Sequence, residues 1–174
     1  MGVFLNVEGM SQYNPIIKKE IQSSACGATT VHVILNHVCA NHPIAIKDIN
    51  ELYKLLGSTK IGLFKWRMIR NLRKILGDSF TIEECSISEA ILQLRAGYPV
   101  AMKFDQYTTF QMFSKNKPMF KYHWTPLIGY EIKDECLQLI IHDNGIPHRP
   151  SRIRRLCYGY HQHVLSFVKI EPKE

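Results

Sequence analysis

The sequence predicts an α+β fold, because helical patterns occupy its first half and strand-like segments its second half. The segments before Gly97 show the three-to-four-residue spacing of apolar side chains that is typical of helices. The segments after it are rich in β-branched and aromatic residues and are separated by turn signals. This order is typical of helices packed on an antiparallel sheet. No repeat or linker is visible, so we expect residues 1–174 to form a single domain.

The first half contains four predicted helices. A short strand at 3–7 and an irregular loop come first, and a helix then begins near Ala25. This helix is apolar on most sides, so we expect it to be central and buried, with Ser23 or Ser24 as its N-cap. The other three helices are predicted at 48–56, with Asp48 as cap, at 63–76, and at 86–97, with Ser86 or Ser88 as cap.

The second half contains four predicted strands. They cover residues 98–104, 122–132, 136–143 and 163–170, and the sequences KDE and NGIP mark turns between them. His161 and His163 alternate at the start of the last strand, where a metal pair is conceivable. No cysteine or carboxylate spacing completes a zinc set, so we favour a surface or core role for both and expect no metal or other cofactor.

Composition narrows the class of protein. The sequence is 45% hydrophobic and 21% charged, which is ordinary for a globular protein. It contains neither an apolar run of the roughly 18 residues that a membrane span needs nor a cleavable signal. We therefore expect a cytoplasmic protein as written, or a secreted effector without a cleavable signal. Five cysteines without a CxxC pair indicate reduced thiols.

The net charge is +7, and the positive residues concentrate in 60–76 and 149–155. A basic balance attracts nucleic acid, anionic lipid or an acidic substrate. No nucleic-acid-binding motif accompanies these segments, so nucleic acid is disfavoured and solvated surfaces are the simpler interpretation. Of the remaining partners, an acidic peptide or protein suits the charge best.

Cys26 is the candidate nucleophile, because it falls in the first turn of the predicted central helix. The free N–H groups and the macrodipole at a helix N-terminus stabilise a thiolate relative to a thiol. Gly27 follows and leaves room for a substrate to approach the sulfur. A thiolate nucleophile also needs a base, usually histidine, and a third group that orients the imidazole.

His123 and Asp143 are the candidate partners of Cys26. His123 opens one predicted strand and Asp143 ends the next, and the two strands are joined by the KDE turn. In an antiparallel pair the beginning of one strand lies close to the end of the other, so the two side chains are expected to be neighbours. Asn144 is the alternative partner for the imidazole.

Five segments, in this order along the chain, resemble the bacterial bacteriocin-processing (double-glycine leader) peptidases and their stand-alone relatives. They are LNVEGMSQ, SACGATTVHVIL, LRAGYPVAM, HWTPLIGYEI and LIIHDNG. The resemblance implies a papain-like fold and a cysteine hydrolase that acts on peptide or amide bonds through an acyl-thioester. In this family Cys attacks the carbonyl carbon, His transfers the proton, Asp holds the imidazole, and a Gln side chain with the Cys backbone N–H binds the oxyanion.

The resemblance places the oxyanion glutamine at Gln12, after the opening strand, with Gln22 as the alternative. It leaves the bond type open between peptidase, deamidase and transamidase. Two other functions remain: a catalytically inactive binding module on the same fold, and a binder of nucleic acid or anionic surfaces through the basic helix at 63–76.

Overall fold

The computed structural model describes residues 2–39, 48–107 and 117–173. One seven-stranded sheet runs through it, in the order β2-β7-β3-β4-β5-β6, and β1 pairs with β4. Within the described residues, all the paired strands of this sheet run antiparallel to one another. The strands are β1 (Gly2–Phe4), β2 (Phe80–Cys85), β3 (Val100–Asp105), β4 (Tyr122–Lys133), β5 (Cys136–Asp143), β6 (Arg152–Cys157) and β7 (Leu165–Pro172).

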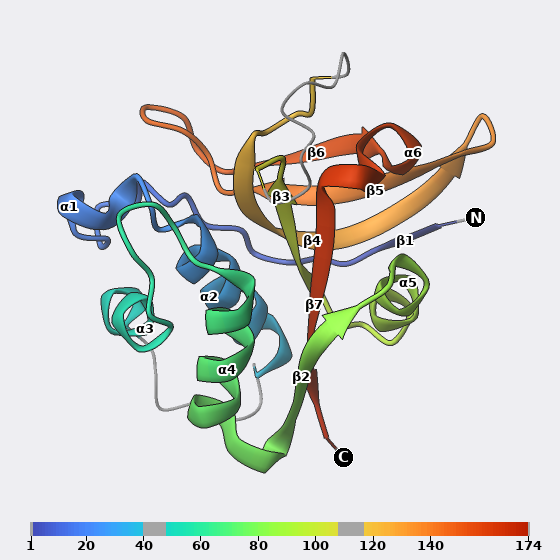
Figure 1. Cartoon of the computed structure of the whole chain (residues 1–174). Helices are drawn as coiled ribbons and strands as arrows, with labels where there is room; N and C mark the ends of the chain where they lie inside the picture. The colour runs from blue at the N-terminus through green and yellow to red at the C-terminus, as the bar shows by residue number, and fades with distance from the viewer. Residues whose placement is uncertain (1, 40–47, 108–116, 174) are drawn as a thin grey trace.

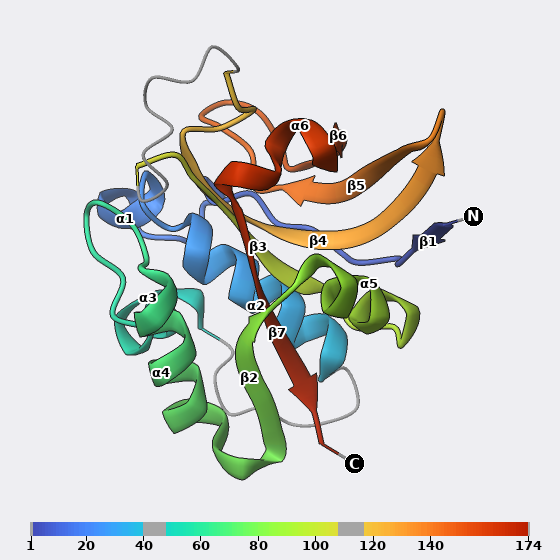
Figure 2. The ribbon, with the colours of Figure 1, turned by 45° about the vertical axis from the view of Figure 1, so that its right-hand side comes forward.

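The helices divide between the two faces of the sheet. Helices α1 to α4 gather on one side and α5 lies on the other, in both views of the ribbon (Figures 1 and 2). The helices are α1 (Lys19–Gln22), α2 (Cys26–Val38), α3 (Ile49–Leu55), α4 (Lys65–Leu76), α5 (Ile87–Arg95) and α6 (Tyr158–His161), with short 3-10 turns at Gly77–Ser79 and Gln162–Val164. The predicted α+β class, with a central helix packed on an antiparallel sheet, is therefore confirmed.

Two hydrophobic clusters cover the two faces, because successive side chains of a strand point in opposite directions. On one face, α2, α3 and α4 pack against Ala101, Trp124 and Val168. On the other face, α5 packs against a cluster that includes Val100 and Met102. Ala101 and its neighbours on β3 therefore alternate between the two cores, which fixes the register of the central strand.

Helix α2 is buried over most of its surface, as its sequence predicted. Its N-cap is Ala25, which makes no side-chain cap bond, so the predicted cap at Ser23 or Ser24 is wrong. The Ser24 hydroxyl instead shares a hydrogen bond with the Tyr53 hydroxyl (2.8 Å). The first turn of α2 therefore keeps free N–H groups close to Cys26.

The other helix boundaries follow the sequence closely. Asp48 caps α3 and accepts from the Asn50 N–H at 2.8 Å. Ser86 caps α5 in a complete capping box with Glu89. Gly77 ends α4 with φ 59°, a conformation that glycine adopts easily. Helix α4 begins at Lys65 and not at residue 63.

Two strands were missed, and both lie at the ends of the strand order. β2 has the sequence FTIEEC and β6 the sequence RIRRLC, and each pairs on one side only. Edge strands commonly carry charged residues because one side of the strand faces water. His161 and His163, expected on the last strand, lie instead in α6 and in the 3-10 turn after it.

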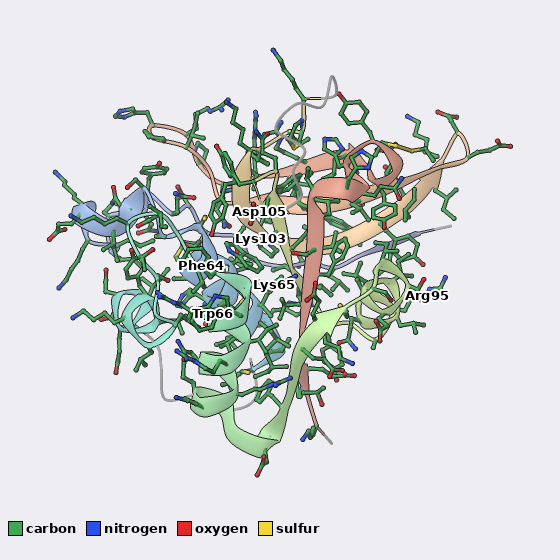
Figure 3. The ribbon with its side chains drawn as sticks, viewed as in Figure 1. Phe64, Lys65, Trp66, Arg95, Lys103 and Asp105 are labelled. Atoms are coloured by element: carbon green, nitrogen blue, oxygen red, sulfur yellow. A yellow bond between two sulfur atoms is a disulfide. The ribbon has the colours of Figure 1, made fainter. Side chains whose placement is uncertain are left out.

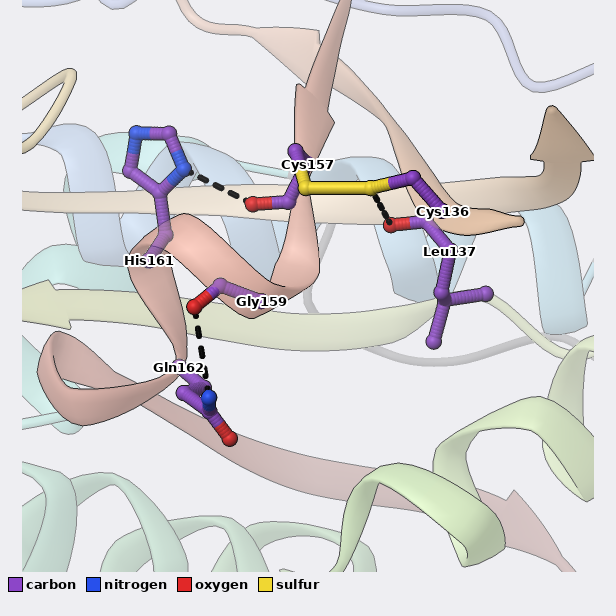
Figure 4. The surroundings of a disulfide bond; sticks show 6 residues. All are labelled: Cys136, Leu137, Cys157, Gly159, His161 and Gln162. Carbon is purple, nitrogen blue, oxygen red and sulfur yellow. Dashed lines mark hydrogen bonds between the residues drawn. A yellow bond between two sulfur atoms is a disulfide. The ribbon is translucent and has the colours of Figure 1, made fainter. Parts of the chain in front are cut away.

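A disulfide joins Cys136 at the start of β5 to Cys157 at the end of β6 (Figure 4). The expectation of five reduced thiols is therefore wrong for this pair, while Cys26, Cys39 and Cys85 are free. Within the described ranges, no helix has the length and apolar character needed to cross a bilayer.

Candidate functional site

Cys26 is the first residue of α2, and only 5% of it is exposed. Burial raises the pKa of its thiol, but a hydrogen bond from His123, the positive charge of that ring and the N–H groups of Trp124 and Gly27 lower it further than burial raises it. The net pKa of Cys26 lies below the ordinary value. The surroundings of this buried sulfur therefore favour the thiolate over the thiol, relative to burial alone.

His123 lies at the start of β4, between Cys26 and Asp143. Its Nε2 is 3.3 Å from Asp143 Oδ1, and the Phe120 ring packs against it with centroids 4.5 Å apart. Burial lowers the pKa of His123, but the hydrogen bonds and negative charges of Asp143 and Cys26 raise it to about 9. At neutral pH the His123 ring is therefore held as an imidazolium beside Cys26.

Asp143 ends β5 and reaches His123 because β4 and β5 form a hairpin whose turn residues, Asp134 and Glu135, have positive φ. Burial raises the pKa of Asp143. The hydrogen bond and charge of His123, a bond from Arg154 (3.2 Å) and the Gly145 N–H outweigh burial, so the net pKa is lowered. The carboxylate is therefore ionised where the imidazolium needs it.

Asn144 joins the nucleophile helix to the His strand and is not the partner of His123. Its Nδ2 donates to the Cys26 carbonyl (3.1 Å), the Thr30 hydroxyl (3.0 Å) and the Trp124 carbonyl (2.9 Å). Only 1% of Asn144 is exposed. The sequence left open whether Asp143 or Asn144 is the partner of His123. Asp143 contacts the imidazole, whereas Asn144 contacts the backbone carbonyls of Cys26 and Trp124.

The two candidate oxyanion glutamines, Gln12 and Gln22, make different contacts. The Gln12 backbone N–H donates to the Asn144 carbonyl at 2.8 Å, and its amide donates to the Gln22 carbonyl at 2.8 Å and bonds Tyr13. Gln22 uses its own amide to brace the preceding loop, through the carbonyls of Asn14 (3.3 Å) and Ile17 (3.0 Å). The Gln12 backbone is therefore tied to Asn144, which binds the Cys26 carbonyl, whereas the Gln22 side chain braces the preceding loop.

Two tyrosines lie close enough to Cys26 to respond to its charge. Burial raises the pKa of Tyr13 and of Tyr122, and the negative charge of Cys26 raises both further. Both phenols therefore stay protonated beside the thiolate. The Tyr122 hydroxyl and the Trp124 indole N–H both donate to the Leu63 carbonyl, at 2.8 and 2.7 Å. The loop before α4 is thereby fixed against the strand that carries His123.

Sequence reasoning missed the groups that support these residues. Arg154 falls in a segment assigned to solvated surface, yet its guanidinium bonds Asp143 and lies over Phe120 (5.3 Å). Lys103 and Asp105 form a buried ion pair on β3 (2.6 Å), and the Lys103 ammonium lies 4.8 Å from the Tyr122 ring centroid (Figure 3). The sequence did contain a signal for this ion pair, because Lys103 and Asp105 are two residues apart on a strand and therefore lie on the same face. The part of the chain that the structure describes holds no cluster suited to a metal ion.

No protein-family model matches the sequence, and no curated protein is similar to it. The solved structures that are similar in fold include two peptidases. The peptidase domain of Streptococcus ComA, a bifunctional ABC transporter involved in quorum sensing, has a TM-score of 0.53 at 18% identity over 86% of this chain and 92% of that chain. A Bacillus anthracis protein described as a C39-like peptidase has a TM-score of 0.64 at 14% identity, over 100% of both chains. The chain therefore has the papain-like fold of the bacteriocin-processing (C39) peptidase domains.

Proposed function

We propose that the protein is a cysteine hydrolase that cleaves a peptide or amide bond, with Cys26 as nucleophile, His123 as acid and base, and Asp143 as the group that orients His123. One observation carries this proposal: a single imidazole is hydrogen-bonded to both the Cys26 thiol and the Asp143 carboxylate. This arrangement is the Cys-His-carboxylate form of the nucleophile, base and orienting group that acyl transfer requires.

In the first half of the reaction, the Cys26 thiolate attacks the carbonyl carbon, and the carbonyl π electrons move onto oxygen to form a tetrahedral oxyanion. The intermediate collapses, the C–N bond breaks, and His123 gives its proton to the departing amine. An acyl-thioester and a neutral imidazole remain. Asp143 holds the ring throughout and stays ionised.

In the second half, His123 takes a proton from water as the oxygen attacks the thioester. The C–S bond breaks, the carboxylic acid leaves, and the thiolate–imidazolium pair is restored. An amine in place of water would give transfer instead of hydrolysis. Hydrolysis is the simplest outcome, because water is the only further reactant that it needs.

The oxyanion is assigned to the backbone N–H of Cys26 and the side-chain amide of Gln12. Gln12 is 4% exposed, and its backbone is tied to Asn144, which also binds the Cys26 carbonyl. Removing one such donor typically lowers the rate about 10²–10³-fold. We expect that loss for Gln12→Ala and a smaller one for Gln22→Ala, which removes only a loop brace.

The pKa of Cys26 can be compared with that of Cys85, because both are free cysteines and both are buried. Burial raises the pKa of Cys85 to about 12, and nearby Glu89 adds to the effect. Cys26 is buried as well, yet its pKa is lowered. The difference comes from His123 and the helix N-terminus, and it favours a reactive thiol over an inactive binding module.

The test is site-resolved alkylation with iodoacetamide near neutral pH, followed by mass spectrometry. We expect Cys26 to react much faster than Cys85 in the wild-type protein, and to lose that advantage in His123→Ala. Equal reactivity of the two thiols would contradict the proposal. A thiol-directed probe on wild type and Cys26→Ala, followed by a peptide-library screen, then defines the bond that is cleaved.

A further inference from the structure

Helix α4 carries five basic residues and no acidic residue in the sequence KWRMIRNLRKIL. Lys65 pairs with Glu84 of β2. In the portion of the chain that the structure covers, the other four, Arg67, Arg70, Arg73 and Lys74, form no ion pair. The charge of this helix is therefore left largely uncompensated by the protein itself.

Two of these arginines are stacked on one exposed aromatic ring. Trp66 is 54% exposed, and the Arg67 and Arg70 guanidinium carbons lie 5.1 and 4.9 Å from its ring centroid. Neutral acceptors also hold them, since Arg67 donates to the Gly57 carbonyl (3.1 Å) and Arg70 to the Asn71 side chain (3.3 Å). We call Trp66, Arg67 and Arg70 the Trp66 platform. Its two guanidinium groups are held in place, and among the described residues neither is paired with a carboxylate.

Leu63, which lies shortly before the Trp66 platform in the chain, connects the platform in space to the candidate nucleophile. A Cβ built on Gly27 would lie 2.7 Å from Leu63 Cβ, so Leu63 packs directly against the residue that follows Cys26. From Leu63 to Trp66 the backbone advances by three residues, about 10 Å at most. Figure 3 shows Phe64, Lys65 and Trp66 together at the N-terminal end of α4.

We propose that the Trp66 platform binds acidic side chains of the peptide substrate, about three to five residues from the bond that Cys26 attacks. This inference rests on the proposed function and adds the substrate class. A planar guanidinium held in a fixed position can bind a carboxylate by donating two parallel hydrogen bonds to it. Ile61, which is 74% exposed in the loop before α4, offers contact for an apolar side chain of the same peptide.

A bilayer is a poorer match for the same surface. The two guanidinium groups lie over the Trp66 ring, so the ring is not free to enter an acyl layer as an isolated aromatic anchor would. Nucleic acid is a poorer match as well, because no nucleic-acid-binding motif accompanies the basic residues of α4. A peptide bound at Cys26 would need only a few residues to reach the platform, because Leu63 packs against Gly27 and lies three residues before Trp66.

The experiment measures fluorescence anisotropy of a short labelled peptide of alternating glutamate and leucine, and of the same peptide with glutamine in place of glutamate. The full chain carrying Cys26→Ala is used, so that no cleavage occurs. The test variant adds Arg67→Ala and Arg70→Ala. The charge-matched control adds Arg152→Ala and Arg155→Ala, two exposed arginines of β6.

We expect the glutamate peptide to bind more tightly than the glutamine peptide, and the platform variant to weaken glutamate-peptide binding about tenfold. The control should change binding by less than about twofold. A second variant, Arg67→Lys with Arg70→Lys, keeps the charge and the long side chains. It should recover only part of the lost binding, because the ammonium is not planar.

Three results would overturn the proposal: equal binding of the two peptides, equal losses in the platform and control variants, or tighter binding of duplex DNA or phosphatidylglycerol vesicles than of the glutamate peptide. Binding is measured without the thiol. The platform can therefore fail while Cys26 remains reactive, and it can succeed if Cys26 proves inert, so the two proposals are tested separately.

Discussion

Arg154 donates to Asp143 through Oδ2, the carboxylate oxygen that His123 does not use. Oδ1 faces His123 and also accepts the Gly145 N–H at 3.2 Å. The carboxylate is therefore held from three directions, by a strand residue, a turn amide and a guanidinium on the edge strand β6. Because Arg154 also covers Phe120, which packs on His123, one side chain constrains both members of the acid–base pair.

Replacing Arg154 with alanine should lower kcat/KM and move the acidic limb of the pH–rate profile to higher pH. Arg154 helps to depress the pKa of Asp143, so without it the carboxylate is protonated at a higher pH and releases His123. Arg155→Ala is the control, because Arg155 pairs with Glu131. An unchanged profile in Arg154→Ala would show that the ion pair is only structural.

The thiolate–imidazolium pair should give a bell-shaped pH dependence of hydrolysis. The pKa of Cys26 is lowered, so activity appears as pH rises through that depressed value. The pKa of His123 is raised to about 9, so activity is lost as pH rises through it and the leaving amine loses its proton donor.

Alkylation should behave differently from hydrolysis, because it needs the thiolate and no acid. The rate for Cys26 should rise once, at a pH below that expected for an ordinary thiol, and should not fall above pH 9. In His123→Ala, burial acts without the opposing charge, so the rise should move to higher pH. Iodoacetamide labelling across pH checks both curves, and a His123→Ala curve that overlays the wild type would contradict the pairing.

Gly27→Ala should damage the site through a steric clash. The new Cβ would lie 2.7 Å from Leu63 Cβ and 3.2 Å from Trp124 Cδ1, and neither neighbour is free to move, since the Leu63 carbonyl is bonded twice. Overpacking of this kind typically costs about 1–3 kcal/mol. Urea unfolding and Cys26 labelling both report it. Gly159→Ala is the matched control, since its Cβ would approach nothing closer than 4.0 Å.

Asn144→Ala should destabilise the fold as well as the site. It leaves the Cys26 carbonyl, the Thr30 hydroxyl and the Trp124 carbonyl without the donor they share. A buried polar group left unpaired costs about 1–3 kcal/mol. We expect urea unfolding to show a loss of unfolding free energy in that range or above it. Asn36→Ala, at an exposed position of α2, should lose almost none. Equal losses would refute this role.

The fold class was predictable from the sequence because periodicity depends only on which side chains are buried. The α2 pattern and the hairpin between β4 and β5 brought Cys26, His123 and Asp143 to expected positions, and the structure places the three together. Their catalytic roles stay predictions, as does the single domain at 1–174. The edge strands were missed because their alternation is masked by charge.

The supporting contacts could not be predicted because they depend on register. Cys157 lies opposite Gln138 on β5, two residues from Cys136, and this pairing is visible only once β6 is known to be a strand. The same holds for Arg154, whose backbone is opposite Ile141 and whose side chain reaches Asp143. Asn144 was considered as an alternative to Asp143, whereas the two perform different tasks.

The bond from Asn144 to Cys26 joins residues 118 positions apart in the chain. During synthesis Cys26 therefore leaves the ribosome long before His123 and Asp143. Until β4 and β5 have been made and have docked on α2, no imidazole lies beside the Cys26 thiol. The order of the chain thus delays the assembly of the candidate site until most of the sheet has been synthesised.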